Sequence, residues 1–159
     1  MTHRAHRLAI LGVLTIPFLT AVPPAGSPGA SRPVARESVS PALLANGAPE
    51  PGVAEFTLTA APAKLSLVPA GKASVMAYNG SVPGPTLVVK EGDRVVVQFR
   101  NRLPEASTIH WHGMHIPFLA DGSPYHPVEP GETFDYVFTV PRGSAGTYWY
   151  HPHPHHRTA

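Results

Sequence analysis

His110-Trp111-His112-Gly113 is the first of two histidine pairs in the sequence, and His151-Pro152-His153 is the second. In a β-strand, residues i and i+2 point to the same face of the sheet. Two such pairs on neighbouring strands would therefore bring four imidazoles together. Imidazole is the commonest metal ligand in proteins and suits copper and zinc. The pairs predict a β-sheet domain that carries half of a metal site, with copper as the favoured ion.

Short apolar runs separated by turn residues fill the sequence from about residue 54 onward. The clearest run is Thr133–Val140, in which apolar and polar side chains alternate as in a half-buried strand. Asn79-Gly80 and Glu91-Gly92-Asp93 are turn sequences between such runs. Further strands are expected at 56–59, 65–67, 75–78, 86–90, 94–100, 108–113 and 147–150. With 20 prolines and 14 glycines, this pattern predicts an all-β Greek-key sandwich or barrel.

The composition excludes several classes of site. The sequence has no cysteine, which rules out a disulfide framework, a cysteine-containing zinc site and the His₂Cys ligand set of a blue copper. Lys and Arg number 12 against 10 Asp and Glu, and the balance is even once Arg4 and Arg7 are set aside. Without a basic stripe, we expect no binding to nucleic acid.

The N-terminus has the parts of a secretory signal peptide. Arg4 and Arg7 precede the apolar run Leu8–Val22, which ends among small residues. The run is shorter than the ~20 residues of a membrane span, although an uncleaved membrane anchor stays open as an alternative. We therefore assign residues 1–22 to a signal peptide and expect a periplasmic, cell-envelope or extracellular protein.

Residues 23–53 consist mostly of Pro, Gly, Ala and Ser with few large apolar side chains. Such a segment cannot bury enough surface to offset the entropy of ordering the chain. We expect it to be a disordered linker, followed by one folded domain over residues 54–159.

The other polar candidates have simple explanations. Asp121 begins an Asp-Gly turn, although its place shortly after the first histidine pair leaves open a role beside the metal. His115 is expected near the site or at the surface, and His126 in a solvated loop. His155 and His156 extend the second pair and are expected in a solvated tail.

Several motifs occur together in one order along the chain: Asn79-Gly-Ser-Val-Pro-Gly-Pro-Thr86, Glu91-Gly-Asp93, His110-Trp-His-Gly113, Asp121-Gly122, Pro130-Gly-Glu132 and Gly146-Thr-Tyr-Trp-Tyr-His-Pro-His153. In this combination the chain resembles the first cupredoxin domain of the multicopper oxidases, which include laccases and bilirubin oxidases. The resemblance covers residues 54 to 159.

The resemblance implies a function and roles for individual residues. The family couples one-electron oxidation of a small reducing substrate at a blue copper to reduction of dioxygen to water at a trinuclear copper cluster. By position, His110 resembles the ligand of the type 2 copper. The residues that resemble ligands of the type 3 copper pair are His112, His151 and His153. Asp121 matches an acidic residue thought to help deliver protons to reduced oxygen, a general acid–base role.

The departures from the family pattern shape the functional hypothesis. The cysteine segment, the remaining cluster histidines and a closing strand after His153 are all missing from the sequence. We therefore expect a truncated N-terminal domain of an exported multicopper oxidase, which needs downstream cupredoxin domains to act. Two alternatives stay open: a free-standing copper carrier, and a subunit that completes its cluster with a partner chain.

Overall fold

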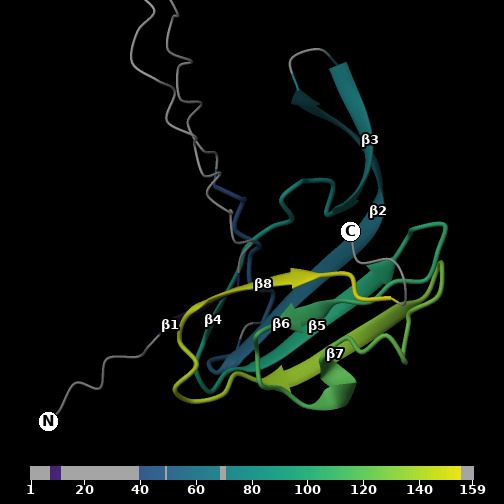
Figure 1. The fold of residues 1–159 in the computed structure, drawn as a ribbon. Helices are drawn as coiled ribbons and strands as arrows, with labels where there is room; N and C mark the ends of the chain where they lie inside the picture. Colours follow the sequence, from purple (N-terminus) through teal and green to yellow (C-terminus); the bar gives the residue numbers. More distant parts are fainter. Residues whose placement is uncertain (1–7, 12–39, 49, 69–70, 155–159) are drawn as a thin grey trace, which may run out of the picture.

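The computed structural model describes residues 8–11, 40–48, 50–68 and 71–154, and nearly all of its regular structure is β-strand (Figure 1). The only helical element in this part of the chain is a single 3₁₀ turn, η1 (Phe118–Ala120). The strands are β1 (Leu8–Leu11), β2 (Val53–Val68), β3 (Gly71–Tyr78), β4 (Leu87–Lys90), β5 (Arg94–Asn101), β6 (His110–His112), β7 (Thr133–Thr139) and β8 (Thr147–His151). The predicted all-β class is confirmed.

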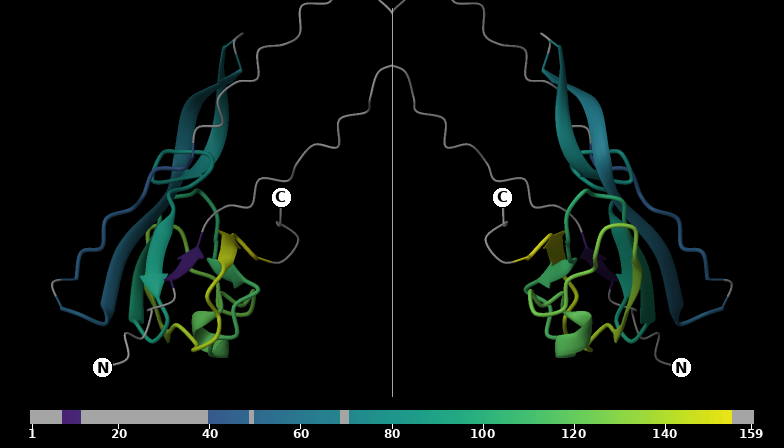
Figure 2. Two further views of the ribbon diagram at one scale, coloured as in Figure 1. Left: turned by 90° about the vertical axis from the view of Figure 1, so that its left-hand side faces the viewer. Right: turned by 90° about the vertical axis from the view of Figure 1, so that its right-hand side faces the viewer.

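The strands form two four-stranded sheets that face each other, as the two side views of Figure 2 show. One sheet has the order β3-β2-β5-β7, and the other has the order β4-β1-β8-β6. In the first sheet β2 runs parallel to β5, and β7 runs antiparallel to β5. In the second sheet β6 and β8 are antiparallel neighbours. The two histidine pairs therefore lie on adjacent strands, or directly beyond the end of one, as predicted.

Strand β2 differs from the two short strands that we expected in its place. It runs through Pro62 without a break, although proline lacks the N–H that a strand interior needs. Pairing with β5 ends at Ala60, so at Pro62 strand β2 pairs with β3 alone. A proline is tolerated where one side of a strand has no partner. The distal parts of β2 and β3 consequently project from the sandwich as a hairpin (Figure 1).

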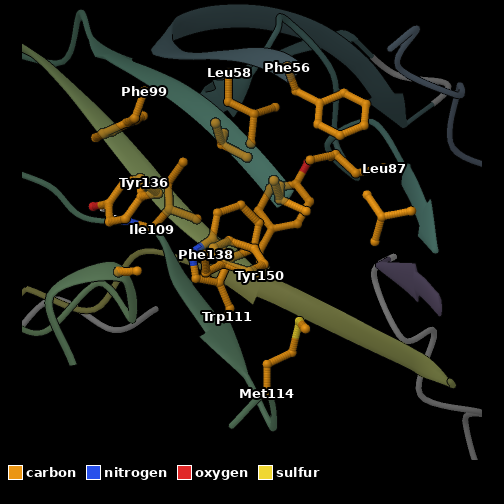
Figure 3. Close-up of a cluster of buried hydrophobic side chains, with 14 of the residues drawn as sticks. Phe56, Leu58, Leu87, Phe99, Ile109, Trp111, Met114, Tyr136, Phe138 and Tyr150 are labelled. Carbon is orange, nitrogen blue, oxygen red and sulfur yellow. Dashed lines mark hydrogen bonds between the residues drawn. The ribbon is translucent and has the colours of Figure 1, made fainter. Parts of the chain in front are cut away.

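The core lies between the two sheets and is rich in aromatic rings (Figure 3). Trp111 of β6 is fully buried, with ring centroids 5.4 Å from Phe138 and 5.9 Å from Tyr150. From the opposite sheet, β2 and β5 contribute Leu58 and Phe99, which are also fully buried. Aromatic side chains remove the largest apolar areas from water, so these rings dominate the stability of the sandwich.

Strand β1 lies inside the stretch that we assigned to a signal peptide. It runs antiparallel to β4 and parallel to β8, with Ile10 opposite Thr147. Residues 1–7 and 12–39, which make up the rest of the expected signal peptide and part of the expected linker, lie outside the described residues. Removal of residues 1–22 would leave the position between β4 and β8 open. No helix in the described part of the chain is long and apolar enough to cross a bilayer.

The last part of the expected linker packs along the domain. The Thr86 N–H donates to the carbonyl of Ala42 at 2.8 Å, and the Leu44 N–H donates back to the Thr86 carbonyl at 2.9 Å. The Gly47 N–H donates to the carbonyl of Glu55. These backbone hydrogen bonds order the segment from about Ala42, so the folded part begins earlier than the expected boundary at residue 54.

Asn101, at the end of β5, ties together the loops on either side of the first histidine pair. Its side chain is fully buried, and its Nδ2 donates to the carbonyls of Glu105 and Val128 at 2.8 Å each. Its Oδ1 accepts a hydrogen bond from the Leu103 N–H at 3.0 Å. The amide therefore satisfies two backbone groups in the connection from β5 to β6 and one, the Val128 carbonyl, in the loop before β7.

Replacing Asn101 by Ala should lower the free energy of unfolding by about 2–4 kcal/mol, because three backbone groups lose their partners. Urea denaturation followed by tryptophan fluorescence measures this loss. Gln98→Ala in the same strand is the control, since Gln98 accepts hydrogen bonds only from the side chain of exposed Arg100. Equal losses in the two variants would contradict the role given to Asn101.

Candidate metal centre

The pairing of β6 with β8 sets out the site. His110 lies opposite His151, Trp111 opposite Tyr150, and His112 opposite Trp149. Side chains alternate between the two faces of a strand. Since Trp111 and Tyr150 are buried in the core, their neighbours His110, His112 and His151 lie on the outer face of the sheet. The core packing of two aromatic rings thus turns three imidazoles away from the core.

These three imidazoles form a group able to hold a metal ion. The ligand nitrogens of His110, His112 and His151 all lie within 4.8 Å of one another. Among the described residues, no other group of His, Cys, Asp and Glu side chains is similarly arranged. Two nitrogens bound to one ion at ~2.1 Å are at most about 4.2 Å apart. Small side-chain rotations would therefore bring all three onto a single ion.

Two backbone carbonyls set the orientation of two imidazoles. His110 Nδ1 lies 2.7 Å from the carbonyl oxygen of Asp121, and His151 Nδ1 lies 2.8 Å from that of Pro152. A carbonyl only accepts, so Nδ1 carries the proton and donates in both rings. The lone pair of each ring is then on Nε2, where it is free to bind a metal. This is the usual arrangement of histidines that ligate metals.

His112 is the third member of the group, and its Nδ1 lies 3.2 Å from His151 Nε2. In the metal-free chain, one proton shared between these two nitrogens gives a hydrogen bond. A metal ion that replaces this proton would find two ring nitrogens close together. The donor set consists of imidazoles alone and fits copper or zinc, both of which accept neutral imidazole.

His153 was predicted as a fourth ligand and lies beside the group, not within it. Its ring centroid is 5.1 Å from that of His110 and 5.8 Å from that of His151. Its backbone N–H donates to Thr108 Oγ1 at 2.9 Å, while its Nδ1 is buried and has no hydrogen-bond partner among the described residues. Buried polar atoms without a partner are rare and often belong to binding sites. A ligand role for His153 stays a prediction.

Asp121 contacts the site through its backbone and its side chain. Its Oδ1 lies 3.3 Å from His110 Nδ1 but outside hydrogen-bond geometry, because this N–H is directed at the Asp121 carbonyl oxygen. Burial raises the pKa of the Asp121 carboxyl, and the neighbouring charges of His110 and His153 lower it only in part. The carboxyl therefore keeps its proton to a higher pH than an ordinary aspartate.

Gly122 allows the Asp121 loop to approach the first histidine strand. Its φ is +70°, and a Cβ at this position would collide with the carbonyl of Ile109 and the backbone N of His110. Only glycine combines this conformation with this close approach. The Asp-Gly sequence was predicted as a turn, and the structure adds that this turn holds His110 in place.

Tyrosine hydroxyls position the backbone directly before His110. The Ile109 N–H donates to the Tyr136 hydroxyl at 2.9 Å, and the Tyr78 hydroxyl donates to the Thr108 carbonyl at 3.4 Å. Burial raises the pKa of Tyr136 to about 12. The alternation of Thr133–Val140 placed Tyr136 on an apolar face, but no signal in the sequence indicated its backbone partner.

Two further histidines in the described part of the chain, His115 and His126, take no part in the group. His115 and His126 are exposed, and the His126 ring contacts Phe118 with centroids 5.8 Å apart. His155 and His156 lie outside the described residues. Trp149, which sequence analysis treated only as an aromatic residue before the second pair, stacks on both His112 and His151.

The fold and site together define a class of protein: a cupredoxin-type β-sandwich whose outer sheet face presents imidazoles able to ligate a metal ion. Comparison with known proteins then identifies the family. The family model described as multicopper oxidase matches residues 61–159, and the chain belongs to this family.

Relatives of known name agree with this assignment. The chain is 39% identical over 108 residues to the multicopper oxidase of Staphylococcus aureus, covering 68% of this chain and 24% of that protein. It is 41% identical over 120 residues to copper resistance protein A of Pseudomonas syringae, covering 72% of this chain and 19% of that protein. The chain thus spans about a quarter or less of these relatives.

Solved structures give the same result. The multicopper oxidase from Campylobacter jejuni, described as a metallo-oxidase, superposes with a TM-score of 0.67 at 42% identity, over 72% of this chain and 24% of that one. The laccase from Pediococcus acidilactici has a TM-score of 0.65 at 31% identity, over 82% of this chain and 27% of that one. The cupredoxin fold and the family expected from the sequence motifs are therefore confirmed.

Replacing Gly122 by Ala should lower the free energy of unfolding more than replacing Gly131 by Ala does. We expect the difference between the two losses to be at least about 2 kcal/mol. Both glycines have positive φ, but no atom lies within 4 Å of a Cβ added at Gly131. Gly131→Ala therefore reports the backbone cost alone, about 1–2 kcal/mol. Urea denaturation of both variants checks the difference, and equal losses would show that the close approach is unimportant.

The pKa of His151 should lie below the ordinary value of 6.5 in the metal-free chain. Burial lowers this pKa, and the nearby charges of His110, His112 and His153 lower it further. The hydrogen bond to the Pro152 carbonyl acts in the opposite direction and raises it. Because the unfolded chain then binds the proton more tightly, stability should fall as the pH drops below 6.5. Denaturation at pH 7.5 and 5.5 measures this, and His151→Gln should reduce the pH dependence.

Proposed function

We propose that this chain is the N-terminal copper-holding domain of an exported multicopper oxidase. It would supply part of a trinuclear copper cluster at which dioxygen is reduced to water while a small substrate is oxidised. The observation that supports this most strongly is the group of His110, His112 and His151 on the outer face of the β6–β8 pair. Family membership makes copper the favoured ion.

In this proposal the hydrogen bonds of each histidine indicate which ring nitrogen would hold copper. His110 and His151 would bind through Nε2, because both Nδ1 atoms donate to backbone carbonyls. His112 would bind through Nδ1, the nitrogen that faces His151. His153 would add a further imidazole from the end of β8. The bound copper would supply the electron transfer on which oxygen reduction depends.

Asp121 would serve as a proton donor beside the cluster. Burial keeps its carboxyl protonated to higher pH, and its Oδ1 is buried with no hydrogen-bond partner in the part of the chain that the structure describes. A carboxyl whose pKa is raised keeps its proton over a wider pH range, which suits general acid catalysis. Its backbone carbonyl has a second task, since it orients His110.

The rest of the cluster and the electron entry would come from outside this sequence. The chain has no cysteine for a blue copper. The three imidazoles lie on a sheet face rather than in a closed cavity, so a further domain or a partner chain could cover them. The relatives are about four times longer than the part that this chain matches.

Export is supported by Arg4, Arg7 and the apolar run that follows them. N-terminal sequencing of the protein recovered from outside the cytoplasm would test this proposal. Recovery of a cytoplasmic chain that still begins at Met1 would refute it.

A copper carrier is the second candidate function. It is favoured by the group of three imidazoles itself, which needs no further domain to hold one ion, and by the similarity to copper resistance protein A. A carrier would bind copper and release it to a partner without consuming oxygen.

Copper titration of the full chain tests the metal site directly. We expect tight binding, and a loss of affinity of about a hundredfold or more when His112 or His151 is replaced by Ala. His126→Ala is the control, since His126 is exposed and outside the group. Equal affinities in all variants would refute the ligand assignment.

Oxygen uptake separates the two candidate functions. The chain should be joined to the downstream part of the Staphylococcus aureus multicopper oxidase, and oxygen consumption measured with a phenolic substrate. The oxidase proposal predicts uptake that His112→Ala abolishes. A fusion that binds copper at the histidine group but takes up no oxygen would favour the carrier.

A further inference from the structure

We propose that Trp149 is a positioning residue: its indole is a platform on which the imidazoles of His112 and His151 lie side by side, held ready for one metal ion. The inference rests on the copper site proposed above and adds a residue that binds no metal itself. Trp149 would act through the two ligands that it contacts.

Strand geometry brings the three rings together. Trp149 pairs directly with His112 across β6 and β8, and it precedes His151 by two residues in the same strand. All three side chains therefore lie on the outer face of the sheet. The indole is stacked on His112 with centroids 4.5 Å apart and planes 26° apart. It is stacked on His151 with centroids 4.2 Å apart and planes 27° apart.

Both imidazoles lie on the same face of the indole. If they lay on opposite faces, their centroids would be about twice as far from each other as from the indole. The observed separation between the His112 and His151 centroids is only 5.4 Å. The rings are therefore neighbours on one surface, and their facing nitrogens are 3.2 Å apart.

His112 depends on this platform more than the other two ligands do. His110 and His151 each donate a hydrogen bond to a backbone carbonyl, which limits their rotation. Among the described residues, His112 has no backbone hydrogen-bond partner for its ring and is held by its contact with His151, an edge contact with His110 and the stack on Trp149. His112 is also the exposed member of the group. Without the indole, its ring would be free to rotate into water.

Trp149 is separate from the core, so its function can be tested apart from folding. The other tryptophan, Trp111, is fully buried in the core cluster, whereas Trp149 is partly exposed and outside that cluster. Ordering a ligand side chain before the metal arrives avoids an entropy cost at the moment of binding. We expect this preorganisation to contribute about tenfold to copper affinity.

The first experiment uses the metal-free chain with ¹³C-labelled histidine rings. NMR relaxation should show that the rings of His112 and His151 are ordered in the wild type, and that Trp149→Leu increases the motion of His112. Trp149→Phe keeps a flat ring and should restore most of the order. Thr147→Val changes an exposed residue on the same face of β8 and should have no effect. Unchanged His112 motion in Trp149→Leu would overturn the proposal.

The second experiment titrates the same four chains with Cu(II) buffered by glycine. Trp149→Leu should bind about tenfold more weakly, Trp149→Phe within about threefold of the wild type, and Thr147→Val equally. Unfolding midpoints recorded in parallel confirm that the variants are folded. If folded Trp149→Leu bound Cu(II) as tightly as the wild type, the role proposed for Trp149 would be overturned. If the wild type bound no copper while Trp149 still ordered the rings, the proposed function would fail and the platform would stand.

Discussion

The structure depends on the inward packing of Trp111 and Tyr150, which lie opposite each other on β6 and β8. Trp111 contacts aromatic residues of β7 and Tyr150 contacts Tyr78 of β3, and the burial of both rings stabilises the contact between the two sheets. Because strand side chains alternate, the same packing turns His110, His112 and His151 to the outer face. The hydrophobic core and the metal group are therefore two sides of one pair of strands, and a shift in register would lose both.

The metal group is held from several directions but stays open on one side. The Asp121 loop supplies a carbonyl to His110, and Gly122 lets this loop reach the strand. Tyr136 holds the backbone one residue earlier, and Pro152 supplies a carbonyl to His151. Residues that orient metal ligands often matter almost as much as the ligands themselves. Here they preorganise three imidazoles on a sheet face that another domain or chain could cover.

Much of the fold was predictable from residue patterns. Alternation indicated most strands, turn residues separated them, and the paired His-x-His motifs placed the site on a sheet. In two places, tertiary contacts override the local signals of the sequence. Pro62 does not interrupt β2, because the strand has only one neighbour there. The segment from Ala42 to Gly47 is ordered by backbone hydrogen bonds to β2 and to Thr86, and Leu44 packs against the core.

The sequence by itself determined which residues could ligate a metal and, through strand periodicity, that each histidine pair would share a face. It also determined that no thiolate takes part, since there is no cysteine. Only the tertiary structure decided that His110, His112 and His151 form the tightest group, that the Asp121 carbonyl orients His110, and that Trp149 lies beneath two ligands. The reason is physical: periodicity sets the direction of a side chain within its strand, whereas distances between side chains depend on the register of strands far apart in the sequence.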